Sequence, residues 1–281
     1  MKRVVLFACA ALLCLAACSP KSGAESESQM KVISYNIRYT GEPAKDGDNH
    51  WNYRRAASIN MVREEQPTVM GVQEALAPQL QFLDENLPEY DYVGVGRDDG
   101  VSAGEHMAIF YLKERIALED WGTFWLSATP AEVSMGWDAV CHRTCTWALM
   151  REKATGKQFA IMNTHLDHRG VEARQKSILL LVEKIAEIIP EGVPLFLTGD
   201  FNSTTDSEIF LPLKSIMQDA REVAAKTDRR GTSNGWGKSS SVIDHIFLRS
   251  AEAEQFSVLC DKNYGAPYIS DHYPVAAEVR F

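Results

Sequence analysis

The stretch at residues 194–202, which reads Pro-Leu-Phe-Leu-Thr-Gly-Asp-Phe-Asn, constrains this chain more than any other. Residues 195–198 are an unbroken run of apolar and β-branched side chains, which is typical of a buried strand. The run breaks at Gly199, and an acid and an amide follow at Asp200 and Asn202. A buried strand that ends in this way holds polar groups rigidly at the edge of a core, as a reactive site requires. A surface turn after a strand is the alternative, and the ends of the other strands decide between the two.

Residues 1–17 read as an export signal and are left out of the fold. Lys2 and Arg3 form a short basic head, and residues 4–17 are an uncharged apolar run. That run is shorter than the roughly 20 residues that a membrane-spanning helix needs, so a signal peptide is the better interpretation.

The signal ends in Leu-Ala-Ala followed by Cys18, which resembles the lipobox of bacterial lipoproteins. The resemblance implies cleavage before Cys18 and lipidation of its thiol; a plain signal peptide with a chance cysteine is the alternative. Residues 18–29 would then be the lipidated cysteine and a flexible tether, because they lack apolar periodicity. We therefore expect a protein of the bacterial cell envelope, anchored to a membrane through its lipid and facing either the periplasm or the surface.

Residues 30–281 are expected to form one domain, because about 250 residues can bury a large core. The hydrophobic content of 45% is ordinary for a globular chain. Without Lys2 and Arg3 the protein has 27 basic and 38 acidic residues, a formal charge of −11. Phosphate backbones are bound mainly by Lys and Arg, so this charge argues against long nucleic acid as a partner. We expect a monomer.

Apolar periodicity and turn residues predict strands alternating with helices along this domain. Strands are expected at residues 30–37, 68–73, 90–97, 106–113, 116–126, 144–152, 158–163, 195–198, 241–247 and 275–281. Helices are expected at residues 53–66, 77–87 and 174–189, with a short one near 207–213. Asn52 is the expected N-cap of the first helix, and Pro67 ends it.

Three cysteines, Cys141, Cys145 and Cys260, lie in this domain. If residues 141–145 form a strand, the first two lie ~13 Å apart, which is too far for a disulfide. A zinc site would need more ligands at suitable spacing. Free thiols are the favoured interpretation, and a bridge from Cys260 to one of the other two stays open.

Six segments of the chain place an acid, an amide or a histidine at or near the end of a predicted strand. They carry Asn36, Glu74, His165, Asp200 with Asn202, Asp244, and Asp271 with His272. Oxygen ligands such as those of Glu74, Asn36 and Asp271 suit a hard cation, Mg²⁺ or Mn²⁺. Such an ion polarises a phosphoryl oxygen, and histidines beside carboxylates transfer protons or stabilise charge.

In this order the motifs resemble the endonuclease/exonuclease/phosphatase superfamily of metal-dependent phosphoesterases. The most specific are Gly-Asp-Phe-Asn at residues 199–202 and Ser-Asp-His-Tyr-Pro at residues 270–274; Gln-Glu at 73–74 and Asn-Thr-His at 163–165 add to them. The resemblance spans residues 30–281 and implies a four-layer α/β/β/α sandwich of two packed mixed sheets flanked by helices.

The resemblance also implies a role for each site residue. Glu74 would be the main metal ligand, with Asn36 and Asp271 nearby. Asp200 would position or deprotonate the attacking water, and Asn202 would bind the phosphoryl group. His272 would contact phosphate oxygens, oriented by Asp244. His165 would be the strand-end histidine of the deoxyribonuclease branch, and Glu105 the acid that pairs with it.

The substrate class follows less directly. Arg143 is a candidate for gripping a phosphate, with a surface strand arginine as the alternative, and Trp236 on an exposed Gly-rich loop is a candidate for stacking on the substrate. With the acidic charge, these residues favour a small phosphoester, whether phosphomonoester or phosphodiester. An extracytoplasmic nuclease and a phospholipase C-like enzyme are alternatives within the family. From another class, a catalytically silent binding lipoprotein could reuse the fold.

Overall fold

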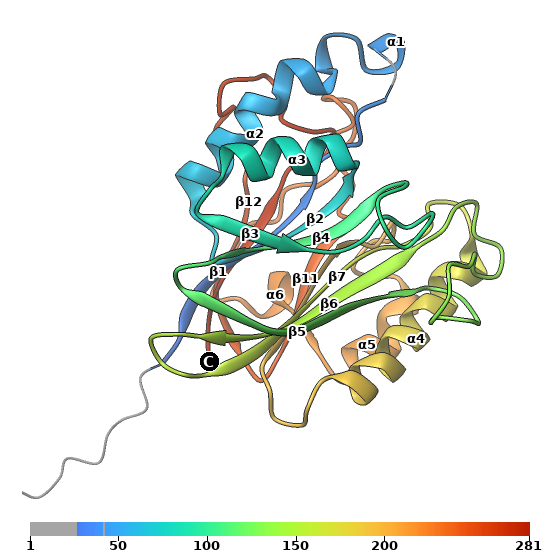
Figure 1. Ribbon diagram of the computed structural model, residues 1–281, viewed down its shortest axis with the longest axis vertical. Helices are drawn as coiled ribbons and strands as arrows, with labels where there is room; N and C mark the ends of the chain where they lie inside the picture. The colour runs from blue at the N-terminus through green and yellow to red at the C-terminus, as the bar shows by residue number, and fades with distance from the viewer. Residues whose placement is uncertain (1–26, 42) are drawn as a thin grey trace, which may run out of the picture.

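Side chains that alternate along each strand build two β-sheets that pack face to face, with helices on the two outer faces (Figure 1). The computed structural model describes residues 27–41 and 43–281. The signal peptide, Cys18 and most of the tether therefore lie outside the described residues. Within the described ranges, no helix combines the length and the apolar character needed to cross a membrane.

The first sheet has seven strands. In spatial order they are β10 (Lys226–Thr227), β12 (Glu252–Val258), β13 (Val275–Arg280), β1 (Gln29–Asn36), β2 (Val69–Ala75), β4 (His106–Leu112) and β3 (Tyr90–Val93). The second sheet has six strands: β5 (Ile116–Trp125), β6 (Thr144–Glu152), β7 (Gln158–His165), β8 (Leu195–Asp200), β11 (Asp244–Arg249) and β9 (Gln218–Asp219). Both sheets mix parallel with antiparallel pairs, as expected.

Three longer helices cover the sheets. They are α2 (Trp51–Glu65), α3 (Ala77–Asn86) and α4 (Val171–Ile188). The short helical turns are α1 (Pro43–Asp46), η1 (Gly47–Asn49), η2 (Glu208–Phe210), α5 (Leu211–Lys214) and α6 (Ala220–Val223). Helices α2 and α3 pack on the first sheet, and α4 with α5 on the second, so the predicted four-layer sandwich is confirmed.

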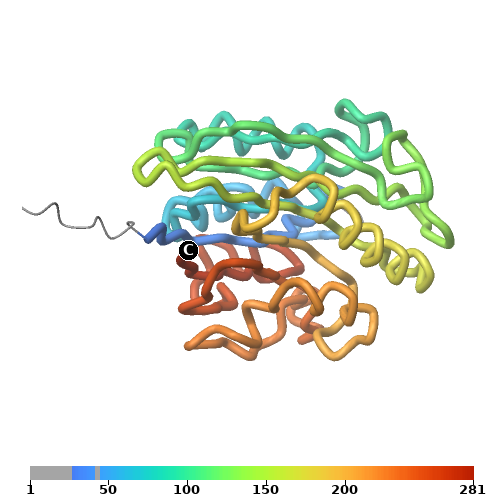
Figure 2. Tube along the Cα trace, turned by 90° about the horizontal axis from the view of Figure 1, so that it is seen from below, coloured from blue at the N-terminus to red at the C-terminus, as the bar shows by residue number. Residues whose placement is uncertain are grey.

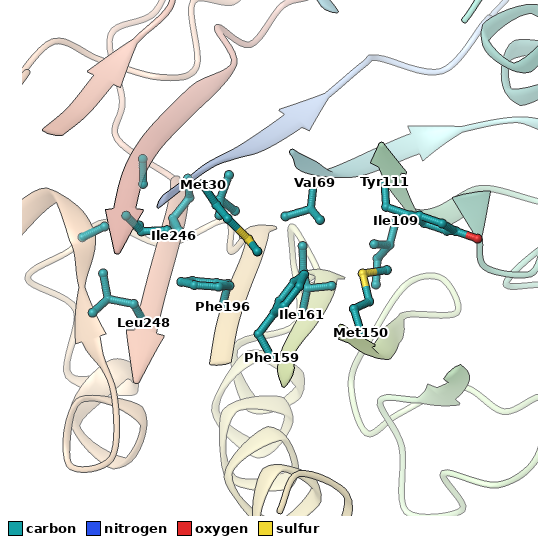
Figure 3. Close-up of a cluster of buried hydrophobic side chains, with 14 of the residues drawn as sticks. Met30, Val69, Ile109, Tyr111, Met150, Phe159, Ile161, Phe196, Ile246 and Leu248 are labelled. Carbon is teal, nitrogen blue, oxygen red and sulfur yellow. The ribbon is translucent and has the colours of Figure 1, made fainter. Parts of the chain in front are cut away.

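Alternation along β1 shows how the layers form. Met30 and Val32 point toward the second sheet, whereas Ile33 and Tyr35 point toward α2 and α3. Figure 3 shows the core between the sheets, where Met30 and Val69 of the first sheet face Phe159 and other residues of the second. The central strands therefore have apolar side chains on both faces, and polar residues on them collect at their ends.

The domain begins slightly earlier than predicted. Ser28 is buried, and its backbone N–H donates to the carbonyl of Phe281 at 3.0 Å. Figure 2 shows the C-terminus beside the start of β1. Residues 28 and 29 thus belong to the folded domain and not to the tether, because the last strand of the chain supplies their hydrogen-bond partners.

Several other boundaries differ from the prediction. His50, not Asn52, caps α2: its Nδ1 accepts from the backbone N–H of Asn52 at 3.3 Å. Asp244 is the first residue of β11 and does not lie inside the strand. Strand β12 has no counterpart among the predicted strands. Cys141 precedes β6, and all three cysteines of the described domain are free, which confirms the favoured interpretation and excludes the alternative of a bridge to Cys260.

Candidate active site

The register of three neighbouring strands places Asp200 between His165 and Asp244. In the parallel pair β7–β8, His165 lies opposite Asp200, and in the antiparallel pair β8–β11, Asp244 lies opposite Asp200. All three side chains are at least nine-tenths buried. The three predicted residues therefore meet because their strands pair in this register.

Asp200 contacts groups from both sheets. Its Oδ2 accepts a hydrogen bond from Asn36 Nδ2 at 3.0 Å, and it lies 3.4 Å from His165 Nε2 and 3.8 Å from His272 Nε2. Its Oδ1 accepts from the backbone N–H of Asn202 at 2.9 Å. Burial is the main reason that the pKa of Asp200 rises to about 7. The charge of His272 opposes this rise, but burial outweighs it.

Glu74 is held at the end of β2 by an irregular backbone. The register of the β2–β4 pair shifts between Val72 and Ala75. Glu74 has a φ of 66°, a left-handed backbone conformation that is disfavoured for residues other than glycine. Its Oε1 accepts from Asn36 Nδ2 at 2.9 Å, and its Oε2 accepts from the backbone N–H of Tyr39 at 3.2 Å. The bulge turns this carboxylate toward Asp200 instead of along the sheet.

The side chain of Asn36 lies between the two acids of the site. Its amide nitrogen faces both Glu74 and Asp200, while its Oδ1 accepts from the backbone N–H of Arg38 at 3.0 Å. In this orientation Asn36 aligns the two carboxylates, and its role as a metal ligand stays a prediction.

Asp271 reaches the same place from the loop before β13. Ser270 ties that loop to β1, because its Oγ donates to the carbonyl of Asn36 at 2.7 Å. Burial raises the pKa of Asp271, and the charge of Glu74 raises it further. The donor set fits a hard divalent cation, because the ligand atoms of Glu74, His165 and Asp200 lie within 4.8 Å of one another and two of these three residues are buried carboxylates.

His272 and Asp244 form a buried pair. His272 Nδ1 lies 3.1 and 2.9 Å from the two carboxylate oxygens of Asp244. Burial alone would lower the pKa of His272, but the charges of Asp244 and Asp200 raise it well above its usual value. The ring is therefore an imidazolium whose Nε2 faces Asp200.

His165 has the opposite electrostatics. Burial, with the positive charges of Arg143 and Arg97, lowers the pKa of His165 well below its usual value. Asn202 Nδ2 lies 3.1 Å from His165 Nε2 and also donates to the carbonyl of Leu166 at 3.0 Å. This ring is neutral, and it lies against the amide predicted to bind the phosphoryl group.

Glu105 lies behind His165, as the resemblance implies. Its Oε2 is 4.0 Å from His165 Nδ1 and accepts from Arg97 Nη1 at 2.6 Å. Burial is the main cause that raises the pKa of Glu105 to about 7. The sequence did not single out Arg97, whose loop position carries no motif.

Arg143 is not a surface strand arginine. It precedes β6 and is only 5% exposed; its Nε lies 3.4 Å from Asp167 Oδ2, and its Nη2 lies 3.0 Å from His168 Nδ1. Its Nη1 has no hydrogen-bond partner among the residues that the structure describes. The guanidinium thus keeps one buried donor unused near the site.

Trp236 is half-buried, whereas the sequence predicted an exposed position. Its ring lies over the guanidinium of Arg54, with 5.7 Å between the ring centroid and Cζ, and its edge meets Tyr268. The backbone N–H groups of Asn234 and Gly235 both donate to the carbonyl of Asp271. The loop that carries Trp236 is therefore built onto the segment that carries Asp271.

Two further arginines escaped the sequence analysis. Arg38 lies between Glu74 and Asp271, and the buried Arg54 donates to the carbonyls of Ile37, Arg38 and Ile269. The only feature of the sequence that could have placed Arg38 near the site is its position two residues after Asn36. Arg38 from the loop after β1 and Arg54 from α2 reach the site only through the tertiary fold, which motif spacing does not encode.

Comparisons with known proteins agree with this geometry. The model of the endonuclease/exonuclease/phosphatase family matches residues 33–272. An uncharacterised protein of Acanthamoeba polyphaga mimivirus is 30% identical over 267 residues, which cover 88% of this chain and 98% of that protein.

Solved structures show the same fold over nearly the whole chain. A family member from Bacteroides vulgatus is 38% identical, with a TM-score of 0.84 over 90% of this chain and 98% of its own. A mannosyl-6-phosphatase of Bacteroides thetaiotaomicron is 36% identical, with a TM-score of 0.85 over 90% of this chain and 100% of its own. From the match of the family model and the site that its motifs build, the chain belongs to the endonuclease/exonuclease/phosphatase family of phosphoester hydrolases.

Proposed function

We propose that this chain is an extracytoplasmic Mg²⁺- or Mn²⁺-dependent phosphoesterase whose substrate is a small phosphoester, with a sugar phosphate favoured. The observation that carries the proposal is the convergence of three side chains on Asp200: the neutral ring of His165, the protonated ring of His272 and the amide of Asn36. These groups differ in charge and can take separate roles around one phosphoryl group.

Asp200 is the residue that handles the attacking water. Its Oδ1 is fixed by the backbone N–H of Asn202, while its Oδ2 faces the two histidines. A carboxylate held in this way can orient a water molecule and accept its proton. Both neighbouring strands lock its position, so the water would be aligned before the substrate arrives.

Other side chains of the site, His272, Asn202, His165 and Arg143, would stabilise the phosphoryl oxygens. His272, charged and oriented by Asp244, would donate to an oxygen that gains negative charge in the transition state. Asn202 and His165 would hold a second oxygen, since the Asn202 amide already lies against the ring. Arg143 would add its unused buried donor to the substrate phosphate.

Glu74 would be the main ligand of the divalent ion, with Asn36 aligning it and Asp271 nearby on the other side of Arg38. Asp200 and His165, whose ligand atoms lie within 4.8 Å of Glu74, would face the same ion. When bound, such an ion supplies Lewis-acid polarisation of the phosphoryl group and stabilises the leaving oxygen. The same convergence of competent groups argues against the catalytically silent binding lipoprotein.

A small substrate is supported by charge and by similarity. The formal charge of −11 repels a long polyanion, whereas one phosphoryl group needs only the site itself. The mannosyl-6-phosphatase similar to this chain over its full length supports a sugar phosphate. Trp236, half-buried beside Asp271, would stack on the sugar.

A substrate panel tests the proposal. The purified protein is assayed with Mg²⁺ against hexose 6-phosphates, a synthetic phosphodiester, phosphatidylcholine vesicles and duplex DNA at about 0.15 M salt, where longer-range attraction is screened. We expect the highest kcat/KM for a hexose phosphate, loss of turnover in excess chelator and recovery with Mg²⁺ or Mn²⁺. Asp200→Asn, which keeps the shape of the side chain, controls for a contaminating phosphatase. Full turnover in chelator rejects metal dependence, and a faster rate on DNA or lipid rejects the substrate class.

Anchoring at the cell envelope is a separate part of the proposal. It is supported by the basic head, the apolar run and the residues that precede Cys18. A phosphatase placed there would act on phosphoesters outside the cytoplasm.

A further inference from the structure

Arg38 lies beside Glu74 and Asp271 in a fixed and unfavourable backbone conformation. Its φ of 56° is left-handed, a conformation that costs a non-glycine residue free energy. Its backbone N–H donates to Asn36 Oδ1, and its carbonyl accepts from Arg54 at 2.8 Å and from Gln79 at 3.0 Å. The surrounding loops therefore hold Arg38 in place against local strain.

The guanidinium of Arg38 lies among three carboxylates. Its Nη1 is 4.0 Å from Glu74 Oε2, its Nε is 3.8 Å from Asp271 Oδ2, and its Nη2 is 3.2 Å from Asp46 Oδ1. Only Asp46 is at hydrogen-bond distance, and Nε has no such partner among residues 27–41 and 43–281. Two of these acids are the ones that would hold the divalent ion.

We propose that Arg38 is an internal counter-cation of the metal site, which competes with the divalent ion for Glu74 and Asp271. The inference rests on the proposed metal dependence. In the metal-free protein the guanidinium offsets the repulsion between the two carboxylates. When the ion binds, both charges share the same acids, so Arg38 weakens the binding of the metal.

Asp46 sets how strongly Arg38 competes. Asp46 is 6% exposed, and its 3.2 Å contact with Arg38 Nη2 is shorter than the contacts of the guanidinium with Glu74 and Asp271. Its own charge neutralises part of that of Arg38. The pair thus balances stability of the empty site against affinity for the ion.

The sign of one mutation separates this proposal from a purely structural role. If Arg38 only positioned Glu74 and Asp271, removing it would loosen both ligands and weaken metal binding. If it is a competing charge, removing it strengthens binding. Arg38→Met keeps the length of the stem and deletes the charge, and Arg38→Lys is the matched control that keeps the charge.

The experiment measures the affinity of the full-length protein for Mn²⁺ by calorimetry and by electron paramagnetic resonance, without substrate. We expect R38M to bind Mn²⁺ about tenfold more tightly, because charges this close interact strongly even when screened by water, and R38K to stay within about twofold of the wild type. Equal or weaker binding by R38M overturns the proposal. Absence of Mn²⁺ binding by the wild type would instead reject the proposed metal dependence, so the two failures are distinguishable.

Asp46→Asn provides a second test, in which the affinity of the single variant does not depend on whether R38M folds. We expect D46N to bind Mn²⁺ more weakly by about fivefold, because Arg38 is then less neutralised. In the R38M background this loss should shrink to about twofold or less, as a coupled pair requires. A loss of the same size in both backgrounds, or tighter binding by D46N, counts against the counter-cation. Thermal unfolding of each variant verifies that the fold is intact.

Discussion

Exchanging Asp244 for asparagine tests whether His272 acts as an imidazolium. Asp244 is 1% and His272 8% exposed, and the two contacts between Nδ1 and the carboxylate oxygens measure 3.1 and 2.9 Å. A hydrogen bond to a charged group contributes about 1.5–3 kcal/mol, which corresponds to roughly a 10- to 150-fold change in rate. Asn keeps the shape and one acceptor but loses the charge. We therefore expect D244N to lower kcat by a factor in this range.

The assay is a double-mutant cycle on steady-state kcat, with D244N, His272→Gln and the double variant. Because Asp244 acts through His272, the double variant should lose about as much as His272→Gln alone. The matched control is Asp219, which pairs with His245 in the same buried geometry at 3.1 Å. Asp219→Asn should combine multiplicatively with His272→Gln. If the losses of D244N and His272→Gln also multiply, the pairing has no catalytic meaning and the reasoning is refuted.

Three further predictions concern other parts of the protein. Asp200→Asn should lower kcat by at least ~10²-fold, as removal of a general base does, with an unchanged circular dichroism spectrum; a smaller loss would mean that another group handles the water. Although burial opposes it, backbone N–H groups and Arg143 lower the pKa of Asp167 to about 2, so its stabilising contribution is complete above the unfolded pKa near 3.9 and is lost as the pH falls toward 2. Asp167→Asn should therefore lower the free energy of unfolding by about 1–2 kcal/mol at pH 7, and urea unfolding at pH 3 should show a smaller difference; a constant difference would contradict the assignment. Cys18→Ser should abolish lipidation, which mass spectrometry and membrane fractionation measure, and unchanged mass and fractionation would disprove the anchor.

The strand ends were predictable because two physical signals coincide in them. A continuous apolar run marks a central strand, and a polar residue that interrupts it must lie at the edge of the core. Glu74, His165 and Asp200 follow this pattern, and the structure brings them together. The fold class followed from the order of the motifs and the resemblance that they carry.

What the sequence did not reveal depends on partners far along the chain. Strand β12 has polar residues at several positions, so its sequence does not predict a strand. It is a strand because its backbone pairs with that of β13. The capping role of His50 depends on the conformation of the turn before α2. Arg38 acquires its setting only when β1, β2 and the loop before β13 meet, so its spacing in sequence gives no warning of its three acidic neighbours.

The pairing of β7, β8 and β11 has a consequence for how the protein loses activity. Many enzymes can inactivate by the opening of one loop while the rest stays folded. Here His165, Asp200 and Asp244 lie opposite one another at the ends of three adjacent central strands, which β7–β8 and β8–β11 pairing holds in register. A slip of one residue would turn Asp200 to the opposite face, so partial rearrangement of β8 cannot preserve the site. The part of the site that these three residues form is therefore lost whenever the pairing of β8 is lost, whereas the loop residues Asn202, Asp271 and His272 can move without unfolding of the sheet.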